Sequence, residues 1–167
     1  MQHPNSDDVV GDFKAAMRRL AATVAIVTSQ SDGRRHGMTA TAVTSLTTTP
    51  PSLLVCINRS ASIHEPIIRS RQFCVNLLAC EHGHLVPIFS GKMTGEERFC
   101  SGDWAIGEFE IPYLANAQAN VFCSVSETLA HGSHSVFIGN VEKVVLFGEP
   151  SPLLYQEGAL YKSIALS

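Results

Sequence analysis

The sequence has few charged residues and no long apolar run. Charged side chains make up 16% of the 167 residues and hydrophobic ones 45%, which excludes a disordered or coiled-coil chain. The formal charge is -3, so the chain offers no general field to nucleic acid or to an anionic membrane. No apolar stretch reaches the roughly 18 residues of a membrane span, and the polar start lacks the pattern of a signal peptide. We therefore expect a soluble cytoplasmic protein with one domain over residues 1–167, of which residues 1–8 form a disordered tail.

Motifs of nucleotide-binding and hydrolytic enzymes are also missing. The chain has no GxGxxG and no GxxxxGK[ST], which removes the simplest Rossmann and P-loop routes to a nucleotide. It has no GxSxG and no HExxH, so no simple motif indicates a serine hydrolase or a zinc protease. Any phosphate that this chain binds must therefore be held by local donors.

The five cysteines form no CxxC pair. Their odd number, and the apolar runs around Cys56, Cys74 and Cys123, favour reduced thiols that are mostly buried in strands as small hydrophobic residues. An alternative is a metal-dependent barrel that uses the C-x-H-x-H string at residues 80–84, Cys80, His82 and His84. Its spacing is unlike that of a four-ligand zinc site.

Hydrophobic periodicity predicts a fold rich in β-sheet. Residues 90–112 are expected to form a long surface loop, and Gly139-Asn140 indicates a β-bulge. Because no crossover helix follows each strand, the pattern favours an antiparallel barrel. Ser31-Asp32-Gly33 is expected to turn the first strand into a hairpin. We predict helices over 8–20, 62–70 and 81–89 and strands over 23–30, 36–47, 52–58, 73–79, 119–130 and 135–147.

Two polar clusters lie where strands are expected to end. Thr39–Ser45 surrounds the small Ala40 and Ala42 with hydroxyls, so it is either an ordinary Thr-rich strand or a backbone that a flat heteroaromatic ring can approach. Ser60 or Ser62 is either the N-cap of a short helix or part of a local anion site.

Two loops add further candidates. Phe89-Ser90-Gly91-Lys92 and the following Arg98 provide two cations and a flexible glycine, which suit a solvated loop or a phosphate contact. His134 lies in the turn between the two long strands, where a histidine is either polar surface or a group that handles a substrate.

A family resemblance runs in order through five stretches between about Phe13 and Tyr161: GMTATAVTSLTTTPPSLLVCINRSASIHEPI, FCVNLLA, FSGKMTGEERF, GSHSVFIGNV and PLLY. They resemble the short-chain flavin reductases of two-component monooxygenases, such as the reductase component of 4-hydroxyphenylacetate 3-monooxygenase. The resemblance implies a mainly β protein with short helices, an antiparallel Greek-key split β-barrel that binds FMN and forms a homodimer.

The same resemblance implies an NAD(P)H:flavin oxidoreductase. NADH or NADPH would reduce FMN or FAD by hydride transfer, and the reduced flavin would diffuse to a partner flavin-dependent monooxygenase. The main alternative is a split barrel that binds flavin or haem without catalysis.

The resemblance also implies which residues form the site. His134 would orient the nicotinamide, Tyr161 would act as a lid, and backbone donors of Thr39–Ser45 would face the isoalloxazine ring. The chain departs from the family pattern at Lys162, where a histidine is usual, and at Ser133, where an acidic residue is common. The implied flavin-binding residues are Thr39, Ala40, Thr41, Ala42, Val43, Thr44, Ser45, Asn58, Arg59, Ser60, Ser62, Phe89, Ser90, Gly91, Lys92, Arg98 and Tyr161.

Overall fold

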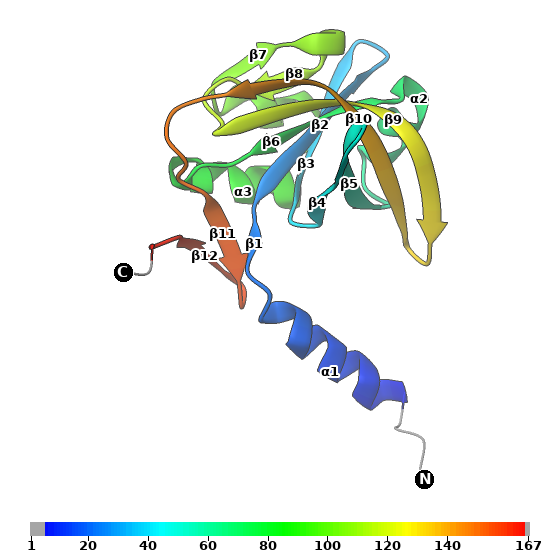
Figure 1. The fold of residues 1–167 in the computed structure, drawn as a ribbon, viewed down its shortest axis with the longest axis vertical. Helices are drawn as coiled ribbons and strands as arrows, with labels where there is room; N and C mark the ends of the chain where they lie inside the picture. The colour runs from blue at the N-terminus through cyan, green and yellow to red at the C-terminus, as the bar shows by residue number, and fades with distance from the viewer. Residues whose placement is uncertain (1–5, 166–167) are drawn as a thin grey trace.

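The computed structural model describes residues 6–165, and its centre is one curled antiparallel sheet (Figure 1). The sheet has seven strands in the order β3-β2-β6-β9-β10-β5-β4. β3 also lies against β5, next to the opposite edge, so the sheet curls towards a barrel. The antiparallel architecture expected from the sequence is confirmed. Its strands are β2 (Ala25–Ser31), β3 (Arg34–Ala40), β4 (Val43–Thr48), β5 (Pro51–Asn58), β6 (Gln72–Leu77), β9 (Ala119–His131) and β10 (His134–Leu146).

Smaller elements cover the ends of this sheet. One small sheet has the order β1-β11-β12, and β7 pairs with β8 in another. The bounds of these strands are β1 (Ala22–Thr23), β7 (Trp104–Ile106), β8 (Pro112–Leu114), β11 (Leu153–Gln156) and β12 (Ala159–Lys162). The helical elements are α1 (Ser6–Arg18), α2 (His64–Ser70), η1 (Cys80–His84), α3 (Leu85–Pro87), η2 (Ile88–Lys92), η3 (Gly95–Cys100) and η4 (Glu108–Glu110).

Tight turns follow the local chemistry of the sequence. Asp32 and Gly33 both have positive φ, 53° and 70°, which matches the two-residue turn of a hairpin between β2 and β3. The β9–β10 register shifts between Ile138 and Gly139, so the predicted bulge is confirmed. A Cβ on Gly139 would lie 2.6 Å from the ring of Phe73, so glycine also allows the close packing at this point.

The amphipathic helix that the N-terminal pattern predicts is α1, and it extends away from the barrel (Figure 1). It already includes residues 6–8 of the tail that was expected to be disordered, whereas residues 1–5 lie outside the described residues. The end of α1 is held by the β11–β12 hairpin, since the N–H of Glu157 donates to the carbonyl of Arg18 at 2.9 Å. Within residues 6–165, no helix is long and apolar enough to cross a membrane.

Two sequence predictions about the barrel wall were wrong. The single strand expected over 36–47 is broken at Thr41-Ala42, and the two parts, β3 and β4, form opposite edges of the sheet. The segment expected to be a surface loop over 90–112 contains the buried Arg98 and Phe99 and the paired strands β7 and β8. Charged residues around these two positions hid the burial. Arg98 is buried against the carbonyls of Gly37 and Met93, and Phe99 packs against Phe89 and Trp104.

The five cysteines are free thiols, as expected. Cys74 and Cys123 are buried, Cys56 and Cys80 are half-buried, and Cys100 is exposed. Burial raises the pKa of Cys74 well above its ordinary value and that of Cys123 to about 12. These two thiols therefore act as small hydrophobic residues of the sheet.

Candidate functional site

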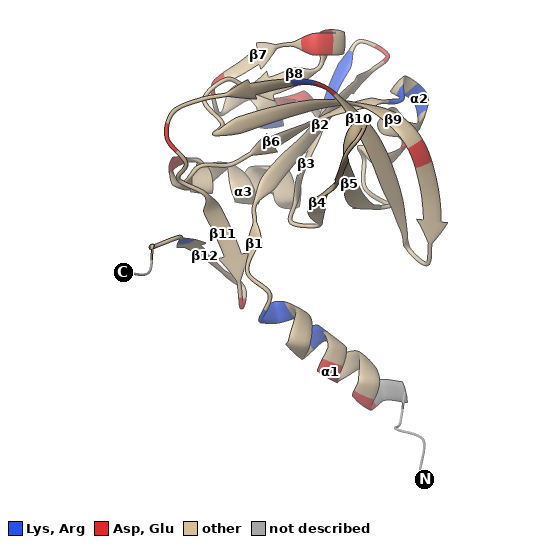
Figure 2. Ribbon diagram, viewed as in Figure 1, with Lys and Arg blue, Asp and Glu red and all other residues tan. Residues whose placement is uncertain are grey.

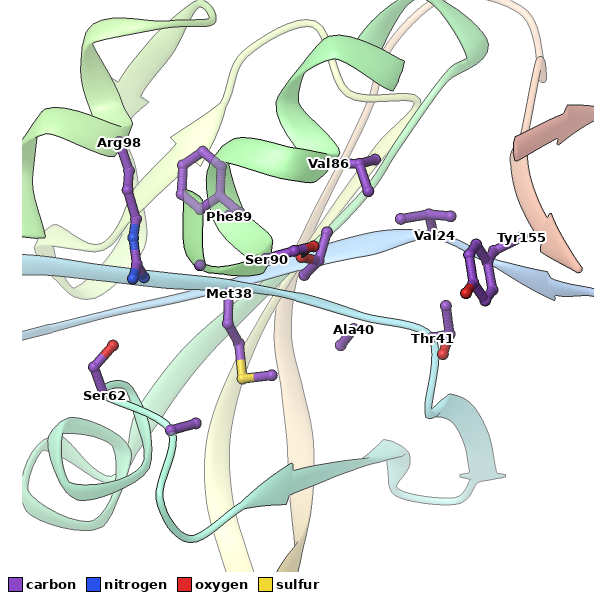
Figure 3. A pocket seen from close by; sticks show the side chains of 13 residues that line it. Val24, Met38, Ala40, Thr41, Ser62, Val86, Phe89, Ser90, Arg98 and Tyr155 are labelled. Atoms are coloured by element: carbon purple, nitrogen blue, oxygen red, sulfur yellow. Dashed lines mark hydrogen bonds between the residues drawn. The ribbon is translucent and has the colours of Figure 1, made fainter. Parts of the chain in front are cut away.

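A cavity of about 480 Å³ opens between β3 and the helical segment from α3 to η2 (Figure 3). Its size lies in the range of roughly 300–1,000 Å³ that is usual for small-molecule sites. The cavity lies between two clusters of buried hydrophobic side chains. Ala40 belongs to one cluster, and Val24 and Phe89 belong to the other. The lining residues are Val24, Met38, Thr39, Ala40, Thr41, Ala61, Ser62, Val86, Phe89, Ser90, Gly91, Arg98 and Tyr155.

The two ends of the cavity differ in chemistry. Figure 3 shows Arg98 and Ser62 at one end, and Val24, Thr41 and Tyr155 at the other. We call these the cationic end and the aromatic end. Such a cavity suits an elongated ligand that carries a negative charge at one end and a flat ring at the other.

Arg98 is positioned by neutral partners. Its side chain is 9% exposed, its Nε donates to the carbonyl of Met93 at 2.7 Å, and its Nη1 donates to the carbonyl of Gly37 at 2.5 Å. Within residues 6–165 it forms no ion pair with a carboxylate. The guanidinium is thus fixed against β3 while its charge stays available to an anion in the cavity.

Aromatic packing fixes the wall opposite β3. The ring of Phe89 lies edge-on to Phe99, with centroids 5.4 Å apart, and 5.2 Å from the centroid of Trp104. β3 approaches this wall closely because residue 37 is glycine: a Cβ there would lie 2.7 Å from the Phe89 ring. The hydroxyls of Thr39 and Ser90 bond across the gap at 2.5 Å.

About half of the site residues that the family resemblance implies line the cavity. It is lined by Thr39, Ala40, Thr41, Ser62, Phe89, Ser90, Gly91 and Arg98. It is not lined by Ala42, Val43, Thr44, Ser45, Asn58, Arg59, Ser60, Lys92, Tyr161 or His134. The break after Ala40 explains part of this division, because it carries the chain from β3 to the other edge of the sheet before β4 begins.

Four further implied residues lie together with Ser133 at one end of the main sheet, and we call these five residues the strand-end cluster: Asn58, Arg59, Ser60, Ser133 and His134. Residues 58 and 134 are partners in the β5–β10 register, and the N–H of Arg59 donates to the carbonyl of Ser133 at 2.9 Å. Asn58 Oδ1 accepts from the N–H and the hydroxyl of Ser60, both at 2.9 Å. The Ser133 hydroxyl bonds His134 Nδ1 at 2.9 Å, and the ring of His134 is exposed.

The interpretation of Ser60 or Ser62 as a helix N-cap was wrong. The N-cap of α2 is Ile63, which makes no side-chain cap bond. Ser60 is instead held by Asn58, and Ser62 lies on the rim of the cavity. Capping of α2 therefore does not account for the serine at position 62.

Sequence reasoning missed the cavity residues Val24, Met38, Ala61, Val86 and Tyr155. Only Met38 carried a usable signal, since it stands two residues before Ala40 in a strand and so shares its face. Tyr155 lines the aromatic end, although the resemblance implies Tyr161. Residue 161 pairs with Leu154, so its side chain lies on the opposite face of the small sheet from that of Tyr155.

Ionic contacts surround the outside of the cationic end. Arg35 bonds Glu96 at 2.6 Å; burial by itself raises the pKa of Glu96, and the bonds from Arg35 outweigh it and hold that pKa below its ordinary value. Burial lowers the pKa of the nearby His36, against the opposing field of Glu96. At neutral pH His36 is therefore a neutral, polar wall residue.

The C-x-H-x-H string falls within η1, and its members have separate partners. Nδ1 of His82 accepts from the N–H of Ala79 at 3.1 Å, His84 Nδ1 bonds the carbonyl of Glu81 at 3.0 Å, and Cys80 Sγ lies 3.4 Å from the carbonyl of Pro152. Across residues 6–165, no three His, Cys, Asp or Glu side chains gather in a way that could hold a metal ion.

Comparison with known proteins identifies the family. The model of the flavin reductase like domain matches residues 17–163 of this chain. The chain belongs to the flavin reductase-like domain family. Its resemblance to that family, first drawn from the motifs, is confirmed over nearly the whole chain.

Relatives within the family are similar along most of their length. The reductase component of an FADH2-dependent resorcinol hydroxylase from a Rhizobium species is 41% identical over 87% of this chain and 82% of its own. The NADH-dependent FMN reductase RutF of Methylorubrum populi is 41% identical over 87% of this chain and 72% of its own. A solved flavin reductase domain protein from Arthrobacter sp. FB24 is 29% identical and superimposes with a TM-score of 0.88 over 95% of this chain and 98% of its own.

Proposed function

We propose that this protein is an NADH-dependent flavin reductase that transfers a hydride to FMN or FAD and releases the reduced flavin to a monooxygenase component. The names of the two relatives that are 41% identical support this, because one is an NADH-dependent FMN reductase and the other the reductase component of a hydroxylase. The observation that carries the proposal is the cavity within the family fold. One end holds the fixed guanidinium of Arg98, which has no carboxylate partner among residues 6–165, and the other end is apolar and aromatic.

The residues present fit a flavin. Arg98 and the hydroxyls of Ser62 and Ser90 provide donors for a terminal phosphate at the cationic end. Ala40 lies beyond them along β3 and has too little bulk to obstruct a flat ring system. Tyr155, which is 43% exposed, can cover that ring from the side of β11.

Catalysis in this proposal depends mainly on positioning. The electron pair and hydrogen of the hydride pass from the nicotinamide to the flavin, solvent supplies the remaining proton, and NAD⁺ and reduced flavin leave. Backbone donors of residues 39–41, which line the cavity, face the edge of the ring that becomes negative. His134 orients the nicotinamide, with an exposed ring held by one bond from Ser133.

A homodimer is part of the proposal. Val9, Val10, Phe13, Met17 and Leu20 of the α1 region are each between 48% and 62% exposed, an unusual arrangement for a helix that stays in water. A second copy of the chain would cover this face and place flavin sites near the interface. Light scattering at micromolar concentration should give twice the chain mass of 18.0 kDa, and a monomeric mass would contradict this part.

The reduced flavin is proposed to reach the monooxygenase by diffusion through the cytoplasm. The free state of all five cysteines agrees with a reducing compartment. A flavin that must leave should be bound only moderately tightly, so we expect it to exchange with free flavin in solution. In gel filtration of the protein with excess flavin, the protein should therefore elute without most of its flavin.

The proposal is tested by adding NADH to the flavin-bound protein in the absence of air. A reductase bleaches the yellow colour of the flavin quickly and in a single turnover, because each NADH reduces one flavin and no oxygen reoxidises it, and NADPH should be a poorer donor. A split barrel that only binds flavin or haem would leave the colour unchanged. Heat-denatured protein is the control for the direct reaction of NADH with free flavin.

A further inference from the structure

The chain between β5 and α2, residues 59–64, forms part of the rim of the cavity, and we call it the rim segment. Ala61 and Ser62 line the cavity from this segment. Figure 3 places Ser62 at the cationic end, together with Arg98. The direction of the Ser62 hydroxyl towards a bound phosphate therefore depends on what holds the rim segment.

Two consecutive turns give the rim segment its shape. The N–H of Ala61 donates to the carbonyl of Asn58, and the N–H of His64 donates to the carbonyl of Ala61, both at 2.9 Å. These bonds are local, so they fix the shape of the segment but not its place against the barrel. That place must come from contacts with other elements.

β10 and the turn before it hold the rim segment at both ends. At its start, the N–H of Arg59 donates to the carbonyl of Ser133 at 2.9 Å. At its end, Nε2 of His64 bonds the hydroxyl of Ser135 at 2.9 Å. Ser62 lies between these two anchors, so the loss of either should let its hydroxyl move.

The ring of His64 is fixed by its surroundings. Its partner Ser135 is 2% exposed and shares the inner face of β10 with the fully buried Phe137. The rings of His64 and Phe137 meet edge-on, with centroids 5.4 Å apart. The adjacent Ile63 belongs to the same buried hydrophobic cluster as Phe137. The imidazole therefore enters the end of the barrel and bonds a hydroxyl that is shielded from water, where an unpaired partner would be costly.

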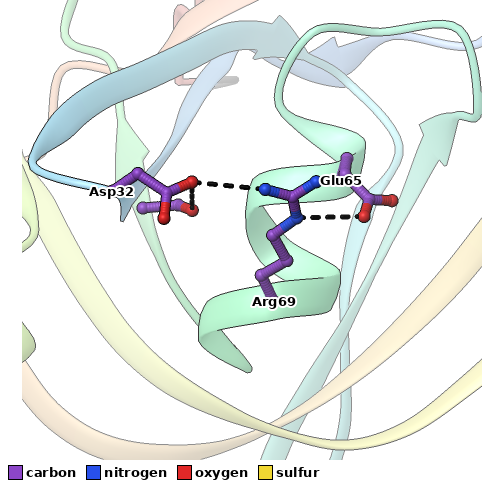
Figure 4. A network of polar contacts seen from close by, with 4 residues as sticks. Asp32, Glu65 and Arg69 are labelled. Atoms are coloured by element: carbon purple, nitrogen blue, oxygen red, sulfur yellow. Dashed lines mark hydrogen bonds and ion pairs between the residues drawn. The ribbon is translucent and has the colours of Figure 1, made fainter.

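Further polar contacts of α2 bind it to a different part of the barrel. Arg69 bonds Asp32 of the β2–β3 hairpin at 3.3 Å and Glu65 at 3.1 Å (Figure 4). Figure 2 shows basic residues on this hairpin and on α2. At the end of the helix, the hydroxyl of Ser70 bonds that of Ser29 in β2 at 3.1 Å. These contacts hold the helix against β2 and its hairpin rather than against β10.

We propose that His64 is a positioning residue for flavin binding: its bond to Ser135 sets the rim segment so that the hydroxyl of Ser62 faces the phosphate of the flavin. This inference rests on the proposed function, because it concerns the same flavin site. His64 does not itself line the cavity, so it acts through Ser62. Because the segment is held before the ligand arrives, little freedom is lost on binding.

The test compares FMN with riboflavin, which has no phosphate, by titration of the protein followed through flavin fluorescence. His64→Leu keeps an apolar side chain beside Phe137 and removes the bond to Ser135. We expect the Kd for FMN to rise about threefold to tenfold, as the weakening of one hydrogen bond predicts, and the Kd for riboflavin to change less than twofold. His64→Gln should restore most of the affinity for FMN, because its amide can donate to the Ser135 hydroxyl or accept from it.

A cycle of double variants shows whether His64 acts through Ser62. Ser62→Ala should raise the Kd for FMN by itself, and adding His64→Leu to it should raise that Kd no further. Effects of the two substitutions that simply multiply would contradict the inference. Ser135→Ala removes the other partner of the bond, so it should reproduce the effect of His64→Leu and carries the same comparison if that variant does not fold.

The matched control is Ser70→Ala, which removes a partly buried hydroxyl bond at the other end of the same helix. It should lower the stability of the protein in urea and leave the Kd for FMN and for riboflavin unchanged. A purely structural role of His64 predicts the same pattern for His64→Leu, with lower stability and no change in the preference for FMN over riboflavin. That pattern would overturn the inference.

The same titrations separate this inference from the proposed function. A wild-type protein that binds neither flavin and does not oxidise NADH with flavin would refute the proposed function itself. A wild-type protein that binds FMN and oxidises NADH, with an unchanged preference for FMN in both His64→Leu and Ser135→Ala, would overturn only the role of His64.

Discussion

The cavity wall and the strand-end cluster both carry residues that the family resemblance assigns to the ligands, but they are built in different ways. In the wall, Arg98 is buried and donates to two backbone carbonyls, and Phe89 packs against Gly37. In the strand-end cluster, Asn58 and His134 are held by short-range turn bonds, and the ring of His134 is exposed. Substitutions in the wall should therefore change folding and binding together, whereas those in the cluster should change only function.

The strongest test of this comparison is Arg98→Ala. It leaves the carbonyls of Gly37 and Met93 without their donor and removes the charge at the cationic end. We expect a loss of roughly 1.5 to 3 kcal/mol in FMN binding and a fall in the free energy of unfolding of about 1 to 3 kcal/mol. Titration with FMN and unfolding in urea measure the two effects.

Lys92 provides the control for this prediction. It belongs to the same segment, but it is exposed and does not line the cavity. Lys92→Ala alone should have little effect, and the double variant should behave as Arg98→Ala does. Riboflavin, which has no phosphate, should be bound almost as well by the variant as by the wild type; equal losses for riboflavin and FMN would contradict a phosphate contact.

Gly37→Ala tests the wall without changing its charge. The new Cβ would lie 2.7 Å from Phe89 and 3.3 Å from Phe99, so one of the rings must move. We expect the free energy of unfolding to fall by about 1 to 3 kcal/mol, with weaker flavin binding. Gly83→Ala in η1 is the matched control, because its new methyl group would lie 3.7 Å from Leu160, an ordinary van der Waals distance. Wild-type stability of Gly37→Ala would show that the wall is looser than its packing implies.

His134→Ala tests the strand-end cluster. Under the proposed function, kcat/KM for NADH falls about tenfold, roughly 1.4 kcal/mol, because a positioning contact to the nicotinamide is lost. Flavin affinity and stability stay unchanged, since the ring is exposed and bonded only to Ser133. Steady-state kinetics against NADH measure the effect.

The register partner of His134, His131, is the control for that experiment. His131→Ala should leave the kinetics unchanged, because the proposal gives that residue no role. Normal NADH kinetics in His134→Ala would remove the residue from the site. A loss of stability in the same variant would instead contradict the contrast between the cluster and the wall.

The same contrast explains what the sequence could predict. The hairpin at Asp32-Gly33, the bulge at Gly139 and the buried strands depend on neighbours close in sequence, so local patterns predict them. The burial of Arg98 and the contribution of Tyr155 to the cavity depend on packing between segments far apart in the chain. No local pattern reports those contacts. The family resemblance implied Arg98, which lines the cavity, and Tyr161, which does not.

The smallest expected effect concerns His36, on β3 beside Arg98 and the cationic end. Burial lowers its pKa in the folded protein, and the ordinary value of 6.5 applies to the unfolded chain. Below pH 6.5 the unfolded chain therefore binds a proton that the folded protein does not, and the free energy of unfolding decreases as the pH falls towards the lowered pKa. His36→Gln should flatten this decrease, measured by urea unfolding at a series of pH values below neutrality. The buried His82, whose pKa burial also lowers, should keep part of the slope in that variant. An unchanged slope in His36→Gln would mean that solvent reaches His36 as freely as it reaches the strand-end cluster, so that burial does not lower the pKa of His36.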